Sequence, residues 1–264
     1  MSRRGQPPND LWVCHLGLVR YADGLAIQET LREQRLAGSI PDTLLLLEHP
    51  PTYTRGRRSA AQDLPFPESF YRDRGIEVHA TDRGGKLTYH GPGQLVGYPI
   101  MAISDIDSHL RSMEAAIVDA LAQVGIGAHS RHREGIEYTG VWVRAHAGHA
   151  GGPNAGERKI ASIGVHVSRG VTTHGFAVNV ELDLEPFSWV IACGLPEVTM
   201  TSLAVESAGQ CESVKCFRKR VAHAFCSAHG RRQRLVSPWR LGIDTANPPS
   251  LKTHLTPTVE PVPA

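Results

Sequence analysis

Apolar residues recur at helical spacing in three segments of the chain. The clearest segment is 107–124, where an apolar side chain returns every three or four residues and Gly125 follows as a stop signal. The segment 214–228 has the same period and follows Ser213, a residue type that caps helices. Residues 20–37 also have the pattern of a helix. We therefore expect three helices.

Between these segments the hydrophobic period changes to two, or becomes a short apolar run. The run TLLLLE at 43–48 predicts a buried strand, which His49-Pro50-Pro51 ends because proline donates no backbone hydrogen bond. Residues 141–144, 160–168 and 175–180 read as strands of an antiparallel or mixed sheet. The sequence thus predicts an α/β (α+β) fold: a single domain with a mixed or antiparallel sheet flanked by helices.

The ends of the chain and one internal segment do not have this patterning. We expect an N-terminal extension over 1–10, one folded domain over 11–234 and a disordered tail over 235–264, where proline, threonine and serine dominate. The segment HAGHAGGPNAGE at 146–157 lies between two predicted strands and is too rich in glycine and alanine to pack. It predicts a mobile hairpin loop.

Composition narrows the function classes. A chain of 264 residues with 41% apolar residues can bury the core of one sizeable domain. Its formal net charge of +2 does not indicate nucleic-acid binding, and no stretch approaches the roughly 20 apolar residues of a membrane span. The N-terminal MSRRGQPPND has no apolar core like that of a secretory signal. We expect a cytoplasmic protein with no nucleic-acid or membrane partner.

The chain has five cysteines, an odd number, which are scattered along the sequence and include no C-x-x-C pair. They therefore predict neither a disulfide framework nor a zinc site. Cys193 differs from the others because it lies in the small-residue turn IACGLP, where a thiol has room for a substrate. A lone cysteine is nevertheless more often a small buried hydrophobe than a nucleophile.

A nucleophilic cysteine needs a neighbour that favours its thiolate, and Lys159 is a candidate. In a regular strand Lys159 shares a face with Ile163, Val165 and Val167, which is usually the buried face. The alternative is that Lys159 sits at a frayed strand end and extends to water.

The stretch RGGKLTYHGPGQLVGYP at 83–99 crowds five glycines around Thr88, Tyr89 and His90. Glycine lets another molecule approach the backbone closely, so this composition predicts a wall against which a ligand lies, with the three side chains orienting its polar end. A purely structural loop is the rival interpretation.

This stretch, together with KIASIGVHVSRGVTTHGFAVNV and IACGLPEVTMTSL, resembles the signature blocks of the LipB family, the octanoyl-[acyl-carrier-protein]:protein octanoyltransferases of lipoate biosynthesis. The resemblance runs from about Leu11 to Gly230 and includes LLLLEHPPTYTRG. It implies the α/β domain shared with biotin and lipoate protein ligases. The implied activity is transfer of an octanoyl or lipoyl group from acyl carrier protein to the lysine of a lipoyl domain, through a cysteine thioester, without cofactor or metal.

By this resemblance Cys193 carries the acyl group, and Lys159 favours the thiolate and moves protons. The other residues that the resemblance implies at the acyl site are Arg83, Gly84, Gly85, Lys86, Leu87, Thr88, Tyr89, His90, Ser162, Ile163, Gly164, His174, Gly175 and Phe176. Two features depart from the family: the segment 146–157 is longer than usual, and the chain beyond about Leu235 has no counterpart. Whether His49, His90 or His174 moves protons stays open.

Two other functions compete with the transferase. A lipoate or biotin ligase activates its acid with ATP and needs no thiol, and a non-catalytic acyl-binding protein needs neither Cys193 nor Lys159. The presence of both favours the transferase. The expected partners are octanoyl-acyl carrier protein as donor, and the lipoyl domains of 2-oxoacid dehydrogenase complexes and the glycine cleavage H protein as acceptors, with the enzyme a monomer. We also hypothesise that Arg55, Arg57 and Arg58 lie at the mouth of the pocket.

Overall fold

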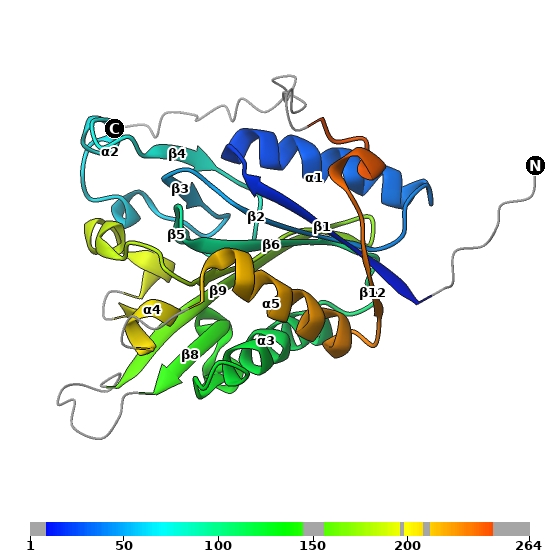
Figure 1. The fold of residues 1–264 in the computed structure, drawn as a ribbon. Coiled ribbons are helices and arrows are strands. Elements are labelled where there is room, and N and C mark those ends of the chain that lie inside the picture. The colour runs from blue at the N-terminus through cyan, green and yellow to red at the C-terminus, as the bar shows by residue number, and fades with distance from the viewer. Residues whose placement is uncertain (1–8, 145–155, 196–197, 208–211, 245–264) are drawn as a thin grey trace, which may run out of the picture.

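The computed structural model describes residues 9–144, 156–195, 198–207 and 212–244 (Figure 1). Its helices are α1 (Tyr21–Leu36), α2 (Glu68–Arg72), α3 (Ile106–Ala122), α4 (Leu203–Glu206) and α5 (Val214–Ala228). Its strands are β1 (Asp10–Leu18), β2 (Thr43–Glu48), β3 (Thr52–Arg55), β4 (Glu77–Ala80), β5 (Leu87–His90), β6 (Gln94–Ile100), β7 (Ala128–Ser130), β8 (Gly140–Arg144), β9 (Glu157–Ser168), β10 (Val171–Asn179), β11 (Thr199–Met200) and β12 (Arg232–Leu235).

The described strands form two sheets. The larger sheet runs β12-β1-β2-β6-β10-β9-β8-β7, with β11 added beside β9, and the smaller one runs β4-β3-β5. β1 pairs in parallel with β12 and β2, whereas the β2, β6, β10, β9 and β8 neighbours are antiparallel. This is the mixed sheet flanked by helices that the hydrophobic pattern predicts, and the fold class is confirmed.

Helices cover both faces of the large sheet (Figure 1). On one face, α1 buries Ile27 and Leu31 against side chains of β2 and β6. On the other face, α3 and α5 pack against each other and against the sheet, and their stripes, including Met113, Ile117 and Phe217, enter the largest hydrophobic cluster. The three helices expected from the sequence are confirmed within one or two residues at each end.

The strand expected at 175–180 begins earlier, at Val171. Arg169 and Gly170 both have positive φ, 51° and 79°, and form a tight turn that joins β9 directly to β10. Because this turn starts antiparallel pairing at Ser168 and Val171, the strand includes the polar residues before His174 that hide its beginning in the sequence pattern.

The start of the segment expected to be a disordered tail is ordered. Leu235 ends β12, and Leu241 and Ile243 are buried in the cluster beneath α1. Their apolar side chains cover sheet surface that would otherwise face water, so the folded domain extends past residue 234. Residues 245–264, 1–8 and most of the segment 146–157 lie outside the described residues. No described helix is long and apolar enough to cross a membrane.

Candidate active site

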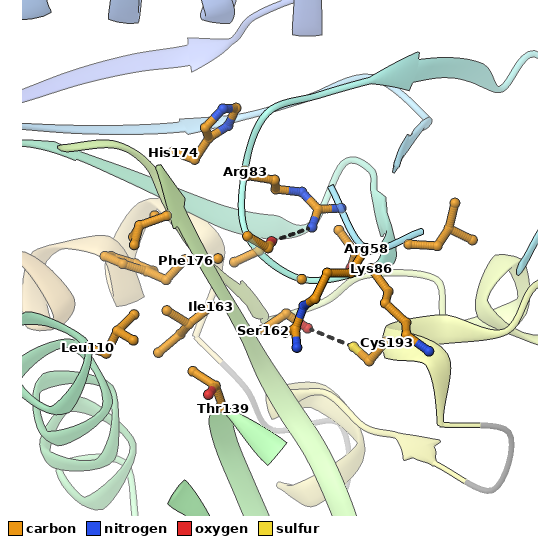
Figure 2. A pocket seen from close by; sticks show the side chains of 18 of the residues that line it. Arg58, Arg83, Lys86, Leu110, Thr139, Ser162, Ile163, His174, Phe176 and Cys193 are labelled. Atoms are coloured by element: carbon orange, nitrogen blue, oxygen red, sulfur yellow. Dashed lines mark hydrogen bonds between the residues drawn. The ribbon is translucent and has the colours of Figure 1, made fainter. Parts of the chain in front are cut away.

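A cavity of about 190 Å³ opens between the loop that precedes β5, the central strands β9 and β10, and the turn that carries Cys193 (Figure 2). In Figure 2 the apolar side chains Leu110, Ile163 and Phe176 lie toward one end of the cavity, and Cys193 lies toward the other. The cavity therefore combines an apolar chamber with a thiol, which is the arrangement that an acyl thioester requires.

Cys193 occupies an exceptional backbone position. It has φ 57° and ψ 7°, and Gly194 follows with φ 64°, so two consecutive residues are left-handed. Side chains other than glycine adopt this conformation rarely, and such strain gathers at functional sites. The turn is closed by the hydrogen bond that the N–H of Leu195 donates to the carbonyl of Ala192. The left-handed turn presents the half-buried thiol to the cavity.

Lys159 is fully buried, with 2% of its surface exposed, and its Nζ donates a hydrogen bond of 3.5 Å to Cys193 Sγ. Ser162 Oγ lies 3.9 Å from the same sulfur. Residues three apart in a regular strand point to opposite faces, so both cannot contact one atom unless the strand is irregular. The pairing between β8 and β9 shifts register between Val141 and Trp142, which leaves one residue of β9 unmatched.

This β-bulge corrects the alternation expected from the sequence. Ile160 and Ala161, adjacent at the bulge, both enter the main hydrophobic cluster, and Lys159 and Ser162 on either side both face Cys193. Lys159 points inward, as the sequence predicts. Because of the bulge, the residue that shares its face of the strand is Ser162, and not Ile163, Val165 and Val167 as expected.

The buried ammonium of Lys159 has no carboxylate partner among the described residues. Its neighbours are the Cys193 sulfur and the ring of Trp142, whose centroid lies 5.1 Å from Nζ. Gly140 has φ 137° and lies so close that a Cβ there would be 2.8 Å from Lys159 Cε. An unpaired charge in this position is costly, and a thiolate at Cys193 is the group in contact that can balance it.

Arg83 organises the wall formed by residues 83–90. Its guanidinium is buried and donates hydrogen bonds to the carbonyl and hydroxyl of Thr54, at 2.6 and 2.8 Å, and to the carbonyl of Gly84 at 3.1 Å. Burial lowers the pKa of Arg83. The wall continues onto β9 by close backbone contact, because a Cβ on Gly164 would lie 2.6 Å from the carbonyl oxygen of Gly84. Glycine is thus required where the wall meets the strand.

The structure brings nearly all the expected site residues together. Of the sixteen expected, the cavity is lined by Arg83, Gly84, Gly85, Lys86, Leu87, Thr88, His90, Lys159, Ser162, Ile163, Gly164, His174, Gly175, Phe176 and Cys193. Tyr89 does not line it. Alternation along β5 turns Tyr89 away into a separate cluster with Tyr53 and Phe187, so it cannot orient a ligand as expected.

Thr88 faces the cavity with an unused hydrogen-bonding group. Its Oγ1 is buried and has no hydrogen-bond partner among the described residues. Buried hydroxyl groups are normally satisfied, because leaving one unpaired costs about 1–3 kcal/mol. A hydroxyl held unpaired beside an acyl-sized cavity is available to a bound ligand.

The three histidines left open by the sequence are buried and held neutral. His49 donates from Nδ1 to the carbonyl of Val19 and accepts at Nε2 from the Tyr98 hydroxyl, both at 2.6 Å, and burial lowers its pKa to about 4. Burial also places the pKa of His90 well below its ordinary value, and lowers that of His174. His49 does not line the cavity, whereas the other two do.

His174 anchors the loop before the wall. Its Nε2 is 2.7 Å from Asp82 Oδ1, and this hydrogen bond lowers the pKa of Asp82 to about 2. His174 also has a left-handed backbone, φ 57°, and its N–H donates to Gln28 Oε1. Its interactions fix the position of the wall on β10 and do not reach the thiol.

The sequence does not identify several residues that line the cavity, among them Tyr21, Tyr98, Leu110 and Thr139. Leu110 lies in the segment 107–124, whose apolar spacing predicts a helix; it packs partly against the core and also lines the cavity. Helical spacing identifies an inward face but not an adjacent cavity, so no local signal marks these residues.

The remaining described cysteines lack comparable surroundings. Burial raises the pKa of Cys14 and of Cys226 to about 12, which suppresses their thiolates, and Cys216 is exposed on α5 outside the cavity. Cys211 lies outside the described residues. Among the described residues no group of three or more histidine, cysteine or acidic side chains is arranged to hold a metal ion.

Comparisons with known proteins place the chain in a family. The family model described as the lipoyl protein ligase A/B catalytic domain matches residues 20–226. An octanoyltransferase of Acidobacterium capsulatum is 44% identical over 203 residues, which cover 73% of this chain and 78% of that protein. The octanoyltransferase of Mycobacterium leprae strain Br4923 is 41% identical over 220 residues, covering 82% of this chain and 87% of that one.

Solved structures with lower identity share the fold. A lipoate-protein ligase A crystallised with ATP has a TM-score of 0.64 at 17% identity, covering 87% of this chain and 88% of that one. A bipartite lipoate protein ligase of Thermoplasma acidophilum has a TM-score of 0.62 at 17% identity, over 87% and 86% of the two chains. From the family match and the close relatives, the chain belongs to the lipoyl protein ligase A/B catalytic domain family and is an acyltransferase of its octanoyltransferase branch.

Proposed function

We propose that this enzyme transfers an octanoyl group from acyl carrier protein to the target lysine of lipoyl domains, through a thioester on Cys193. The observation that carries the proposal is the hydrogen bond of 3.5 Å between Lys159 Nζ and Cys193 Sγ at the end of an apolar cavity. Relatives at 41–44% identity that are named octanoyltransferase support the choice of acyl group.

In the first half-reaction, the Cys193 thiolate attacks the carbonyl carbon of the octanoyl thioester. A carbon–sulfur bond forms to Cys193, and the bond to the carrier thiol breaks. The departing thiolate takes a proton from the ammonium of Lys159, which leaves an acyl-enzyme beside a neutral amine. The charge of Lys159 is thus used twice, first to balance the Cys193 thiolate and then to protonate the leaving group.

In the second half-reaction, the acceptor lysine attacks the same carbonyl as a neutral amine. The amide bond forms, the bond to Cys193 breaks, and Lys159 takes the surplus proton, which restores the starting ion pair. The amine of Lys159 has no carboxylate neighbour among the described residues and lies in hydrogen-bond contact with the sulfur, so it is the group in position to move protons at the reacting centre.

The walls of the cavity suit the acyl chain and its polar end differently. Leu110, Ile163 and Phe176 offer apolar contact to the chain, while the free hydroxyl of Thr88 is available to the carbonyl oxygen. A hydroxyl that binds this oxygen more strongly as negative charge develops would stabilise the transition state of both half-reactions.

The test is octanoyl transfer in the absence of ATP. Purified enzyme, octanoyl-acyl carrier protein and a lipoyl domain should give octanoylated domain, and Cys193→Ala should give none. The same enzyme with free octanoate and ATP should give no product. Product that appears with octanoate and ATP, and persists in Cys193→Ala, would show a ligase and overturn the proposal.

A further inference from the structure

The lining of the cavity carries an excess of positive charge. The lining residues include four cations, Arg58, Arg83, Lys86 and Lys159, and one described carboxylate, Glu137. Figure 2 shows Arg58 and Lys86 near Cys193 and apart from the apolar end marked by Leu110. Arg57 is exposed beside Arg58, and Arg55 is half-buried. We call Arg55, Arg57, Arg58 and Lys86 the basic rim.

The basic rim is fixed to the wall of the cavity. The N–H groups of Gly56, Arg57 and Arg58 donate hydrogen bonds to the carbonyls of Lys86, Arg83 and Gly85. A Cβ on Gly56 would lie 2.5 Å from the carbonyl oxygen of Gly85, so the two loops are in close contact. The side chain of Lys86 in turn covers Gly194, next to the nucleophile. The backbone of the basic rim is therefore fixed against the wall of the cavity.

The rim has no carboxylate partners among the described residues. Elsewhere on the described surface arginines commonly form ion pairs, such as Arg220 with Glu212 and Arg232 with Asp10. Unpaired cations clustered at a pocket entrance attract anions and steer them toward it. The rim thus has the charge of a binding surface for an acidic or phosphorylated group.

The two expected substrates bring arms of opposite charge to this entrance. The donor's arm is phosphopantetheine, which carries a phosphodiester, whereas the acceptor's arm is a lysine, which is a cation in solution. Because unpaired arginines attract the first and repel the second, we infer that the basic rim is the docking surface of the acidic carrier protein and the phosphodiester of its arm. This inference rests on the proposed function and assigns the donor to one side of the entrance.

The experiment measures single-turnover acylation of Cys193 by three donors: octanoyl-carrier protein, octanoyl-phosphopantetheine and octanoyl-pantetheine. The double variant Arg55→Glu with Arg57→Glu reverses the two charges of the basic rim whose residues do not line the cavity. Its matched control is Lys215→Glu with Lys219→Glu, on the exposed side of α5, which does not line the cavity. The last two donors differ in the phosphate alone, so their ratio reports the contribution of that group.

We expect the rim variant to be acylated by low concentrations of octanoyl-carrier protein about tenfold more slowly, or worse, with a smaller effect in high salt. Its rate with octanoyl-pantetheine should equal that of the wild type, and the advantage conferred by the phosphate should disappear. The control variant should keep the wild-type rate with octanoyl-carrier protein and the advantage conferred by the phosphate.

An unchanged carrier-protein rate in the rim variant, or an effect confined to the KM for the lipoyl domain, would overturn the assignment. The second outcome would make the rim the acceptor's surface. Acylation of the wild type by octanoyl-pantetheine tests the proposed function separately, because this donor lacks both phosphate and protein. If the wild type forms no adduct with any donor, the proposed function and the inference both fail.

Discussion

Replacement of Lys159 by methionine tests the ion pair at the centre of the proposed chemistry. Methionine keeps most of the length of the side chain and removes the ammonium, which lies 3.5 Å from Cys193 Sγ. At an effective dielectric constant near 20, a charge pair at this separation attracts by about 5 kcal/mol. Because Cys193 is half-buried and partly screened by water, we take about 2 kcal/mol as the lower bound.

An energy of about 2 kcal/mol corresponds to roughly a 30-fold change in the thiolate population. Lys159→Met should therefore be alkylated by iodoacetamide at pH 7 about 30-fold more slowly than the wild type, and should lose octanoyl transfer to a greater extent because proton transfer is lost as well. Lys159→Arg keeps a charge and should recover alkylation without recovering transfer. Lys215→Met on α5 is the matched control and should behave as the wild type.

The stability of Lys159→Met should not fall together with its reactivity. The ammonium is buried without a carboxylate partner among the described residues, so its removal should leave the thermal midpoint of unfolding unchanged or higher. Slow alkylation in a fully folded protein then reports the ion pair and not a damaged fold. An alkylation rate within twofold of the wild type would refute the reasoning.

Three further changes have distinct expected results. Thr88→Val removes a hydroxyl without a hydrogen-bond partner, so kcat should fall about tenfold or more while urea unfolding shows no loss of stability. A fall in kcat that is matched by a loss of stability would contradict the role of this hydroxyl toward the ligand. Gly97→Ala places a Cβ 2.1 Å from the ring of Phe176, so it should push the ring into the cavity and shift acyl preference to shorter chains, measured by competition between thioesters of different length. Burial lowers the pKa of His49 to about 4, so its neutral form contributes stability that is present above about pH 6.5. As the pH falls toward 4, about 3 kcal/mol of this stability is lost. His49→Gln should therefore lose less stability than the wild type between pH 7 and 4.5, and an equal loss would show that other groups control acid unfolding.

The sequence predicts the elements of this fold well where one hydrophobic period is long and unbroken. The helices α3 and α5 have such stripes, and their bounds agree closely with expectation. It predicts less where a strand changes environment. Val171 to His174 carry mainly polar side chains within a buried strand, because hydroxyl groups such as that of Thr172 bond to neighbouring carbonyls instead of to water.

The candidate site was found from residue types and family resemblance, but its geometry was not. The β-bulge at Ile160 decides which side chains face Cys193, and it depends on pairing with β8, which no local pattern reveals. The left-handed conformation of Cys193 likewise comes from the turn and its contacts. The sequence predicts Tyr89 on the cavity side, which is wrong. Composition does not distinguish the two faces of a strand that is buried on both sides.

The most direct test of the account is the intact mass of the enzyme after it is mixed with octanoyl-acyl carrier protein and no acceptor, followed by peptide mapping. We predict one octanoyl adduct, on the peptide that contains Cys193, which hydroxylamine removes and which a lipoyl domain discharges. Cys193→Ser should form no adduct that a lipoyl domain discharges. Octanoyl transfer that proceeds with no enzyme adduct, or with an adduct on another cysteine, would contradict the account.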